Sequence, residues 1–129
     1  MEYSPKNSNA LIGQLGEAAV ADYLHQNLYQ LIARNWRKGR YEIDLIVARA
    51  GVLHFVEVKT RKAEGLTTPE AAITRQKRLA LRHAANAFLA SNEAYYRGYD
   101  IQFDLAAVHR NADGTLRVEW IEDAIEYGW

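Results

Sequence analysis

The sequence has no cysteine, only two prolines and one methionine among its 129 residues, and no excess charge of either sign. The absence of cysteine excludes disulfides and thiolate zinc sites, and it suits a reducing cytoplasm. No apolar run approaches the roughly 18 residues of a membrane span. Residues 1–9 are polar and lack the apolar core of a signal peptide. These absences predict a soluble, cytoplasmic protein with no membrane partner.

The length is typical of one domain, and 49% of the residues are hydrophobic. We therefore expect residues 1–129 to form a single domain, with residues 1–8 as a loose terminus. Residues 34–82 hold twelve Lys and Arg against five Asp and Glu, whereas residues 93–129 hold three against eight. Such a basic sector can present a positive face to a polyanion. On charge counts alone, a well-mixed solvated surface is the alternative.

Hydrophobic spacing predicts the element order α-β-β-β-α-β-β. Gly13 and Gly16 near the start of the first helix indicate the close approach of another backbone, because glycine is costly inside a helix. The simplest packing of this order is α/β, with a mixed sheet flanked by the two helices. The first helix is expected over residues 9–27, and the strands over 29–36, 41–48, 52–60, 101–109 and 115–121.

The second helix is expected to follow a loop at residues 63–68. Thr68 is suited to be its N-cap and Pro69 its first residue, and it should run to about Ser91. Three arginines, Arg75, Arg78 and Arg82, lie on one face of it and are either a solvated surface or a phosphate track. Its apolar stripe is predicted to comprise Ile73, Ala80, Ala84, Ala87 and Phe88.

Two neighbouring strands carry carboxylates in apolar surroundings. Alternation places Glu42, Asp44 and Ile46 on one face of the first strand, and it places Glu57 and Lys59 on one face of the second. The short connection between the strands predicts an antiparallel hairpin, in which Asp44 lies near Glu57.

Such a carboxylate pair points to a hard metal ion. Carboxylates are rarely buried unless they are paired or hold a metal, and two of them repel unless a cation lies between. Mg²⁺ takes one or two carboxylates and keeps water and substrate phosphates as its other ligands. Lys59 can then orient the attacking water and offset charge in the transition state. The alternatives are an ordinary strand-end pair of Glu57 and Lys59, and a turn-capping Asp44.

Asp44, followed after twelve residues by Glu57-Val58-Lys59, resembles the D…(D/E)-x-K signature of the PD-(D/E)XK nuclease superfamily. The motif Gly13-x-x-Gly16-Glu17 resembles the first helix of its Holliday-junction-resolvase-like members, which carries a further active-site glutamate. Over residues 12–125 the sequence is similar to the YraN-like family of small bacterial proteins. The matching segments are 16–19, 34–37, 42–46, 56–61 and 120–124, together with Lys77.

This resemblance implies a restriction-endonuclease-like αβββαβ core and a metal-dependent nuclease that cleaves DNA, with branched DNA as one candidate substrate. The implied cofactor is Mg²⁺ or Mn²⁺, held by Asp44, Glu57, the Val58 carbonyl and Glu17, while Lys59 positions the water. A homodimer is a further expectation, because a small nuclease often pairs to address two strands. The residues expected to bind nucleic acid are Arg34, Arg37, Lys38, Arg61, Lys62 and Lys77.

Several alternatives stay open at this point. Tyr41 stands where the family usually has glycine, and its ring can either crowd the mouth of the site or stack on a base. Glu17 and Lys77 are alternatively plain solvated side chains, and Trp36 is either a stacking residue or part of the core. The protein is alternatively a non-catalytic nucleic-acid-binding module on the same scaffold. A third hypothesis makes the acidic C-terminal third a docking surface through Trp120, Tyr127 and Trp129.

Overall fold

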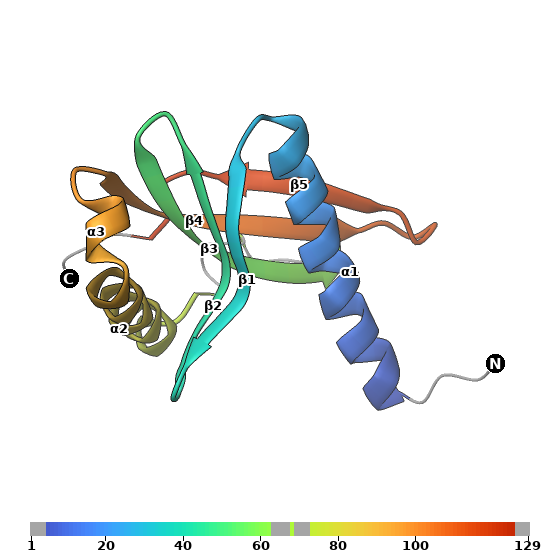
Figure 1. The fold of residues 1–129 in the computed structure, drawn as a ribbon. Coiled ribbons are helices and arrows are strands. Elements are labelled where there is room, and N and C mark those ends of the chain that lie inside the picture. The colour runs from blue at the N-terminus through green and yellow to red at the C-terminus, as the bar shows by residue number, and fades with distance from the viewer. Residues whose placement is uncertain (1–4, 63–67, 69–72, 126–129) are drawn as a thin grey trace.

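The structure is a computed structural model that describes residues 5–62, 68 and 73–125, and for residues 5–10 and 62 it describes the backbone alone. The chain confirms the expected order of elements and adds one short helix, α3 (Figure 1). Four residues are too few to produce a periodic pattern in the sequence. The elements are α1 (Pro5–Gln26), β1 (Gln30–Lys38), β2 (Tyr41–Arg49), β3 (Val52–Lys62), α2 (Arg75–Ser91), α3 (Glu93–Tyr96), β4 (Asp100–Arg110) and β5 (Leu116–Ile121).

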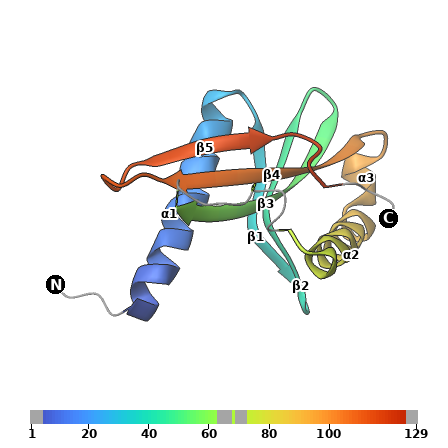
Figure 2. The same ribbon diagram turned by 180° about the vertical axis from the view of Figure 1, so that it is seen from behind.

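The five strands form one mixed sheet in the order β1-β2-β3-β4-β5. β3 and β4 are parallel, and the other neighbouring strands are antiparallel. The parallel pair follows from α2, since a parallel connection has to return along the sheet through a crossover element. Figure 2 shows β4 and β5 from behind, with α1 and α2 on opposite sides of them. The mixed α/β sheet flanked by helices is consistent with a restriction-endonuclease-like core.

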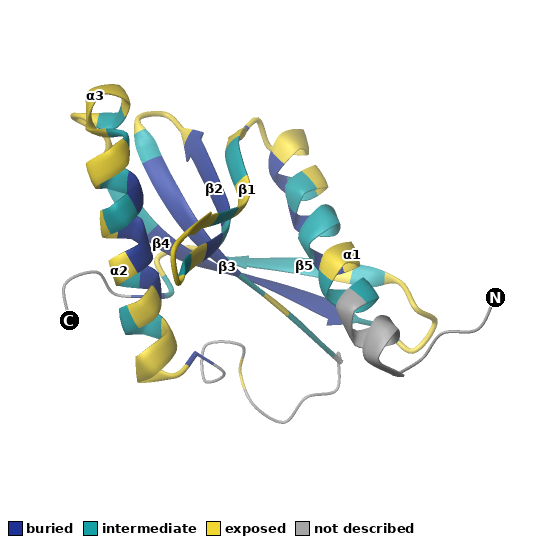
Figure 3. Cartoon of the chain, turned by 60° about the horizontal axis from the view of Figure 1, so that its bottom comes forward, coloured by how far each residue is buried: buried dark blue, intermediate teal, exposed yellow. Residues whose placement is uncertain are grey.

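Each helix covers its own face of the sheet (Figure 3). α1 packs against β1, β3, β4 and β5, whereas α2 packs against β2 and β3. The core under α1 includes Val20 and Leu24, and the core under α2 includes Phe55 and Phe88. β4 is buried on both faces between them, as the apolar run in its sequence requires. Among the described helices, none combines the length and apolarity needed to cross a bilayer.

Two tight turns fix the hairpins on either side of β2. Ala50 and Gly51 both have positive φ, 51° and 79°, as a two-residue type I′ turn requires. Gly39, with φ 59°, starts the two-residue turn between Lys38 and Tyr41, which are paired across β1 and β2. These turns set the register that brings the acidic residues together.

Three expectations are wrong in detail. α2 begins at Arg75 with Thr74 as its N-cap, whose hydroxyl accepts the Lys77 N–H at 3.1 Å. The expected first position, Pro69, lies outside the described residues. Ala80 is exposed, because a helix that begins at Arg75 buries Leu81, Ala84, Ala85 and Phe88. α1 begins at Pro5 and not at residue 9, where the first helix was expected to start.

Candidate functional site

The candidate site lies where β2 and β3 separate. Their pairing runs from Arg49↔Val52 to Leu45↔Val56 and ends there, whereas β3 stays paired with β4 as far as Lys62↔Arg110. The opening therefore arises because β2 leaves the sheet. It places Asp44 and Glu57, the next residues along each strand, at the mouth of the separation. We call these two residues the carboxylate pair.

β1 is also irregular beside this opening. Its register with β2 shifts between Leu31 and Ala33, and Asn35, which lies between the paired residues Arg34 and Trp36, has φ 50°. Asn is among the few residues that tolerate this left-handed conformation. Ile43 packs in the core under α2 and Leu45 in the core under α1, although residues two apart on a regular strand share a face. The expected common face of Glu42, Asp44 and Ile46 is therefore wrong, because the alternation breaks at Asp44.

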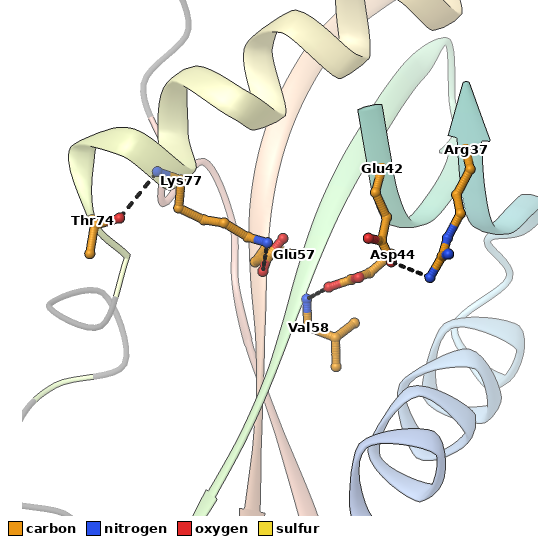
Figure 4. Close-up of polar contacts among 7 residues, drawn as sticks. All are labelled: Arg37, Glu42, Asp44, Glu57, Val58, Thr74 and Lys77. Carbon is orange, nitrogen blue, oxygen red and sulfur yellow. Dashed lines mark hydrogen bonds and ion pairs between the residues drawn. The ribbon is translucent and has the colours of Figure 1, made fainter. Parts of the chain in front are cut away.

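The freed backbone of β3 is bound by the Asp44 side chain. Asp44 points from β2 towards β3, and the Val58 N–H donates a hydrogen bond of 2.8 Å to its Oδ2 (Figure 4). The carboxylate replaces a carbonyl that a continuous ladder would have supplied. Asp44 thus has a structural role as well as any chemical one, and the Asp44 carboxylate is held next to the backbone of Glu57 and Val58.

Both members of the carboxylate pair are shifted towards the protonated form. Burial and the negative charge of Asp44 raise the pKa of Glu57 to about 7, and Glu57 is only 7% exposed. Burial also raises the pKa of Asp44, and Glu17 and Glu42 add to that shift, while the Val58 N–H and Lys77 oppose it. The two acids therefore lie in an environment that calls for a positive charge.

Lys77 supplies part of that positive charge from α2. It reaches from the first turn of α2, and its Nζ lies 3.3 Å from the Glu57 Oε1 (Figure 4). Burial lowers the pKa of Lys77, but the charges of Glu57, Asp44 and Glu42 outweigh this and raise it overall. The side chain is 54% exposed, so the ion pair faces solvent on one side. Lys77 thus lies beside the carboxylate pair.

On the α1 side, Glu17 and Lys59 line one pocket. The pocket has a volume of about 340 Å³, and Ile12, Gly13, Val58 and Thr60 complete its lining. α1 approaches β3 closely there, because a Cβ at Gly16 would overlap the Thr60 hydroxyl. The segment against Gly16 is thus the Thr60 side chain and not another backbone, as had been expected, whereas a Cβ at Gly13 would meet open space. Gly16 allows the adjacent Glu17 to reach the end of β3.

On the α2 side lies a second pocket of about 340 Å³, which we call the hairpin groove. The tip of the β1–β2 hairpin forms one wall and α2 forms the other. Sequence reasoning missed this groove, because nothing in the pattern shows that the hairpin tip meets α2. The first wall includes Arg40, Tyr41 and Glu42, and the second includes Gln76, Lys77 and His83.

The remaining basic residues expected to meet nucleic acid are spread around the site. Arg37 is exposed and pairs with Glu42 at 3.2 Å, and the Lys38 Nζ donates to the Ser91 hydroxyl at 2.9 Å. Arg34 is exposed, and Arg61 is half-buried near the end of β3. The side chain of Lys62 and the loop at 63–67 lie outside the described residues.

Two of the tryptophans considered as ligand-binding residues, Trp36 and Trp120, are half-buried and pack against other aromatic rings. Trp36 contacts Phe88 edge-on, with ring centroids 5.5 Å apart. Trp120 is half-buried against Tyr23 and Tyr29. Tyr127 and Trp129 lie outside the described residues.

Sequence reasoning also missed a buried acid–base pair, His54 and Asp104, on β3 and β4. The His54 Nδ1 lies 2.6 Å from the Asp104 Oδ2, and Asp104 is fully buried. The other oxygen of Asp104 accepts hydrogen bonds from the Gln102 amide and the Asp123 N–H. These contacts join β3, β4 and the segment after β5. The only signal in the sequence was a polar residue within each of two apolar strands.

Comparisons with known proteins agree on one family. A family model described as "Uncharacterised protein family UPF0102" matches residues 16–108, which include every candidate site residue named above from Glu17 to Lys77. A UPF0102 protein of Nitratidesulfovibrio vulgaris is 44% identical over 114 residues, covering 88% of this chain and 83% of the relative. A UPF0102 protein of Symbiobacterium thermophilum is 40% identical over 113 residues, covering 88% and 94%.

One solved structure is a distant match. It is described as the structure of Pyrococcus furiosus SfsA in complex with Ca²⁺, with 15% sequence identity and a TM-score of 0.38. The alignment covers 92% of this chain and 65% of that chain. A likeness at this level supports no inference about function.

Proposed function

This chain belongs to the uncharacterised protein family UPF0102, and we propose that it is a Mg²⁺- or Mn²⁺-dependent phosphodiesterase of the PD-(D/E)XK type that acts on nucleic acid, with DNA as the favoured substrate. One observation carries the proposal. Two acids with raised pKa values meet where β2 leaves β3, with Lys77 and the pocket of Glu17 and Lys59 beside them. Fold alone would not support an activity.

The donor set fits a hard cation. Asp44 and Glu57 offer carboxylate oxygens, and the Val58 carbonyl and Glu17 are further oxygen donors close by, which are the ligands that Mg²⁺ and Mn²⁺ prefer. Among the described residues, no three His, Cys, Asp or Glu side chains are grouped as a metal cluster. Two carboxylates are nevertheless enough for Mg²⁺, which completes its shell with waters and substrate phosphates.

The residues divide the chemistry between them. A bound Mg²⁺ supplies charge neutralisation and a more acidic water. Asp44 and Glu57 hold that charge at the end of the β2–β3 opening, and the Val58 N–H fixes the orientation of Asp44. Lys59, exposed at the rim of the pocket with Glu17, orients the attacking water and offsets negative charge on the phosphorus oxygens. Arg34, Arg37, Lys38 and Arg61 contact phosphates in a sequence-neutral, salt-dependent way.

Calorimetry with Mn²⁺ or Mg²⁺ tests the proposal first. The wild type should bind the ion saturably, and Asp44→Asn and Glu57→Gln should each abolish binding while the protein remains folded. Asp22→Asn removes an exposed acid on the opposite side of α1 and is the matched control. Cleavage of linear, flapped and branched DNA then follows, with Lys59→Ala expected to lose activity. Equal cleavage by the wild type and Lys59→Ala would refute the mechanism.

A second candidate function is a non-catalytic nucleic-acid-binding module. It is favoured by Lys77, whose ammonium group lies 3.3 Å from the Glu57 Oε1 and supplies a positive charge there. This candidate requires DNA binding that is equal with Mg²⁺ and with a chelator, and no cleavage by the wild type. Metal-stimulated hydrolysis that Asp44→Asn abolishes would eliminate it.

A further inference from the structure

Lys77 connects the hairpin groove to the carboxylate pair. Lys77 lines the groove and contacts Glu57 at its inner end, while Glu42 lines the groove and influences the pKa of Asp44. The groove is therefore adjacent to the position of a phosphate at the carboxylate pair. A volume of about 340 Å³ falls within the range of small-ligand pockets, roughly 300–1,000 Å³.

We propose that the hairpin groove binds the base of one unpaired nucleotide, next to the phosphate at the carboxylate pair. The substrate class is then nucleic acid with a single-stranded segment at the cleavage point. This inference rests on the proposed function and adds to it the choice of substrate.

The ring of Tyr41 lines the groove and is the group on which the base would stack. The ring is half-buried and packs against the core under α2, so its position is fixed by side chains that cannot move freely. The Arg40 guanidinium lies over the same ring, 5.7 Å from its centroid, and because Arg40 is exposed this group would move aside for a base or stack on it. An aromatic ring with a neighbouring guanidinium is the combination on which bases stack without regard to sequence.

Charge in the groove suits a polyanion. Arg40 and Lys77 face it from opposite walls, and the negative charge of Glu42 is offset by its ion pair with Arg37. Gln76 and His83 add hydrogen-bonding groups on the α2 wall. The groove thus offers a surface for the base and cationic groups for the flanking phosphates.

Contact with the face of a base selects an unpaired nucleotide. In a duplex both faces of a base are covered by its neighbours, so a base has to leave the stack before it can lie on a protein ring. The Tyr41 ring sits in a groove between a hairpin tip and a helix, where an unstacked base of a loop, flap or single strand can enter.

Binding measured without cleavage tests this inference. Fluorescence anisotropy in a chelator would compare a short labelled oligothymidylate with a duplex of matched length. Tyr41→Leu should weaken single-strand binding about 5- to 150-fold, the effect of about 1–3 kcal/mol per stacked base. It should leave duplex binding within about twofold. Tyr41→Phe keeps the ring and should bind like the wild type.

Tyr95→Leu is the matched control, because Tyr95 is 79% exposed on α3 and lies outside the groove. If Tyr41→Leu does not fold, an abasic nucleotide moved along the oligonucleotide tests the same contact with wild-type protein. Loss of affinity confined to one position supports the groove. Equal affinity at every position, or equal binding by Tyr41→Leu and wild type, overturns it. Failure of the phosphodiesterase proposal would appear separately, as absence of metal-dependent cleavage by a protein that still binds single strands through Tyr41.

Discussion

Glu57→Gln should remove a pH dependence of stability that the wild type shows between pH 4.5 and about 7. In the folded protein the pKa of Glu57 is raised from 4.5 to about 7 by burial and by Asp44. Between these two values the folded chain keeps a proton that the unfolded chain has released. Because the folded state then binds more protons, the free energy of unfolding falls as the pH rises through this window.

The size of the effect follows from the shift. Each pKa unit corresponds to about 1.4 kcal/mol, so the shift to about 7 corresponds to roughly 3 kcal/mol. Glutamine has nearly the same shape and no charge. The variant should therefore match the wild type near pH 4 and exceed its stability by up to roughly 3 kcal/mol near pH 8.

Urea unfolding in a chelator, followed by tryptophan fluorescence, measures the difference at several pH values. Glu93→Gln removes a carboxylate that is 72% exposed and should leave the pH curve parallel to that of the wild type. The burial argument is refuted if Glu57→Gln also runs parallel to the wild type, or if wild-type stability relative to Glu57→Gln increases with pH. Saturating Mg²⁺ should abolish the difference in slope, because a bound cation stabilises the ionised pair.

Three further predictions concern contacts around the site. Asp44→Ala should lose about 1–3 kcal/mol of stability, because it leaves the Val58 N–H without an acceptor. Asp44→Asn keeps the acceptor and should unfold at nearly the wild-type urea concentration. Urea unfolding of both variants thus separates the loss of this hydrogen bond from the loss of the carboxylate charge. Gly16→Ala should destabilise the wild type, because its Cβ overlaps the Thr60 side chain. In a Thr60→Ala background the same change should stabilise the protein by about 1 kcal/mol, since alanine is a better helix former than glycine. A double-mutant cycle that shows no coupling between the two positions would contradict the close approach. Thr74→Ala should cost about 1 kcal/mol and Thr74→Ser little, since the hydroxyl caps α2; equal losses would argue against the cap.

The fold was largely predictable because local patterns determine it. Strand alternation and short turns specified the β2–β3 hairpin, and its register places Asp44 next to Glu57. The start of α2 was not predictable, since Thr68 and Thr74 are both good caps in the sequence and only the packing of Leu81 and Phe88 under the helix distinguishes them.

The details of the site depend on contacts between distant segments. The break in β2 involves a positive φ at Asn35 in the neighbouring strand, and no residue pattern in β2 itself reveals it. The reach of Lys77 to Glu57 depends on how α2 lies across β2 and β3. The hairpin groove and the His54–Asp104 pair have the same origin, because side chains far apart in the chain meet only once the sheet and helices have packed.

Lys77 lies at both the carboxylate pair and the hairpin groove. Binding of a metal at the first and of nucleic acid at the second would therefore be coupled. The Lys77 ammonium group, 3.3 Å from the Glu57 Oε1, acts as a tethered counterion. If Glu57 held a cation as proposed, that cation would take over this role, and the ammonium group would be released to attract a phosphate in the groove. By linkage, any factor by which metal strengthens nucleic-acid binding is the factor by which nucleic acid strengthens metal binding. On the proposed function, one exposed lysine would thus couple cofactor binding to substrate binding.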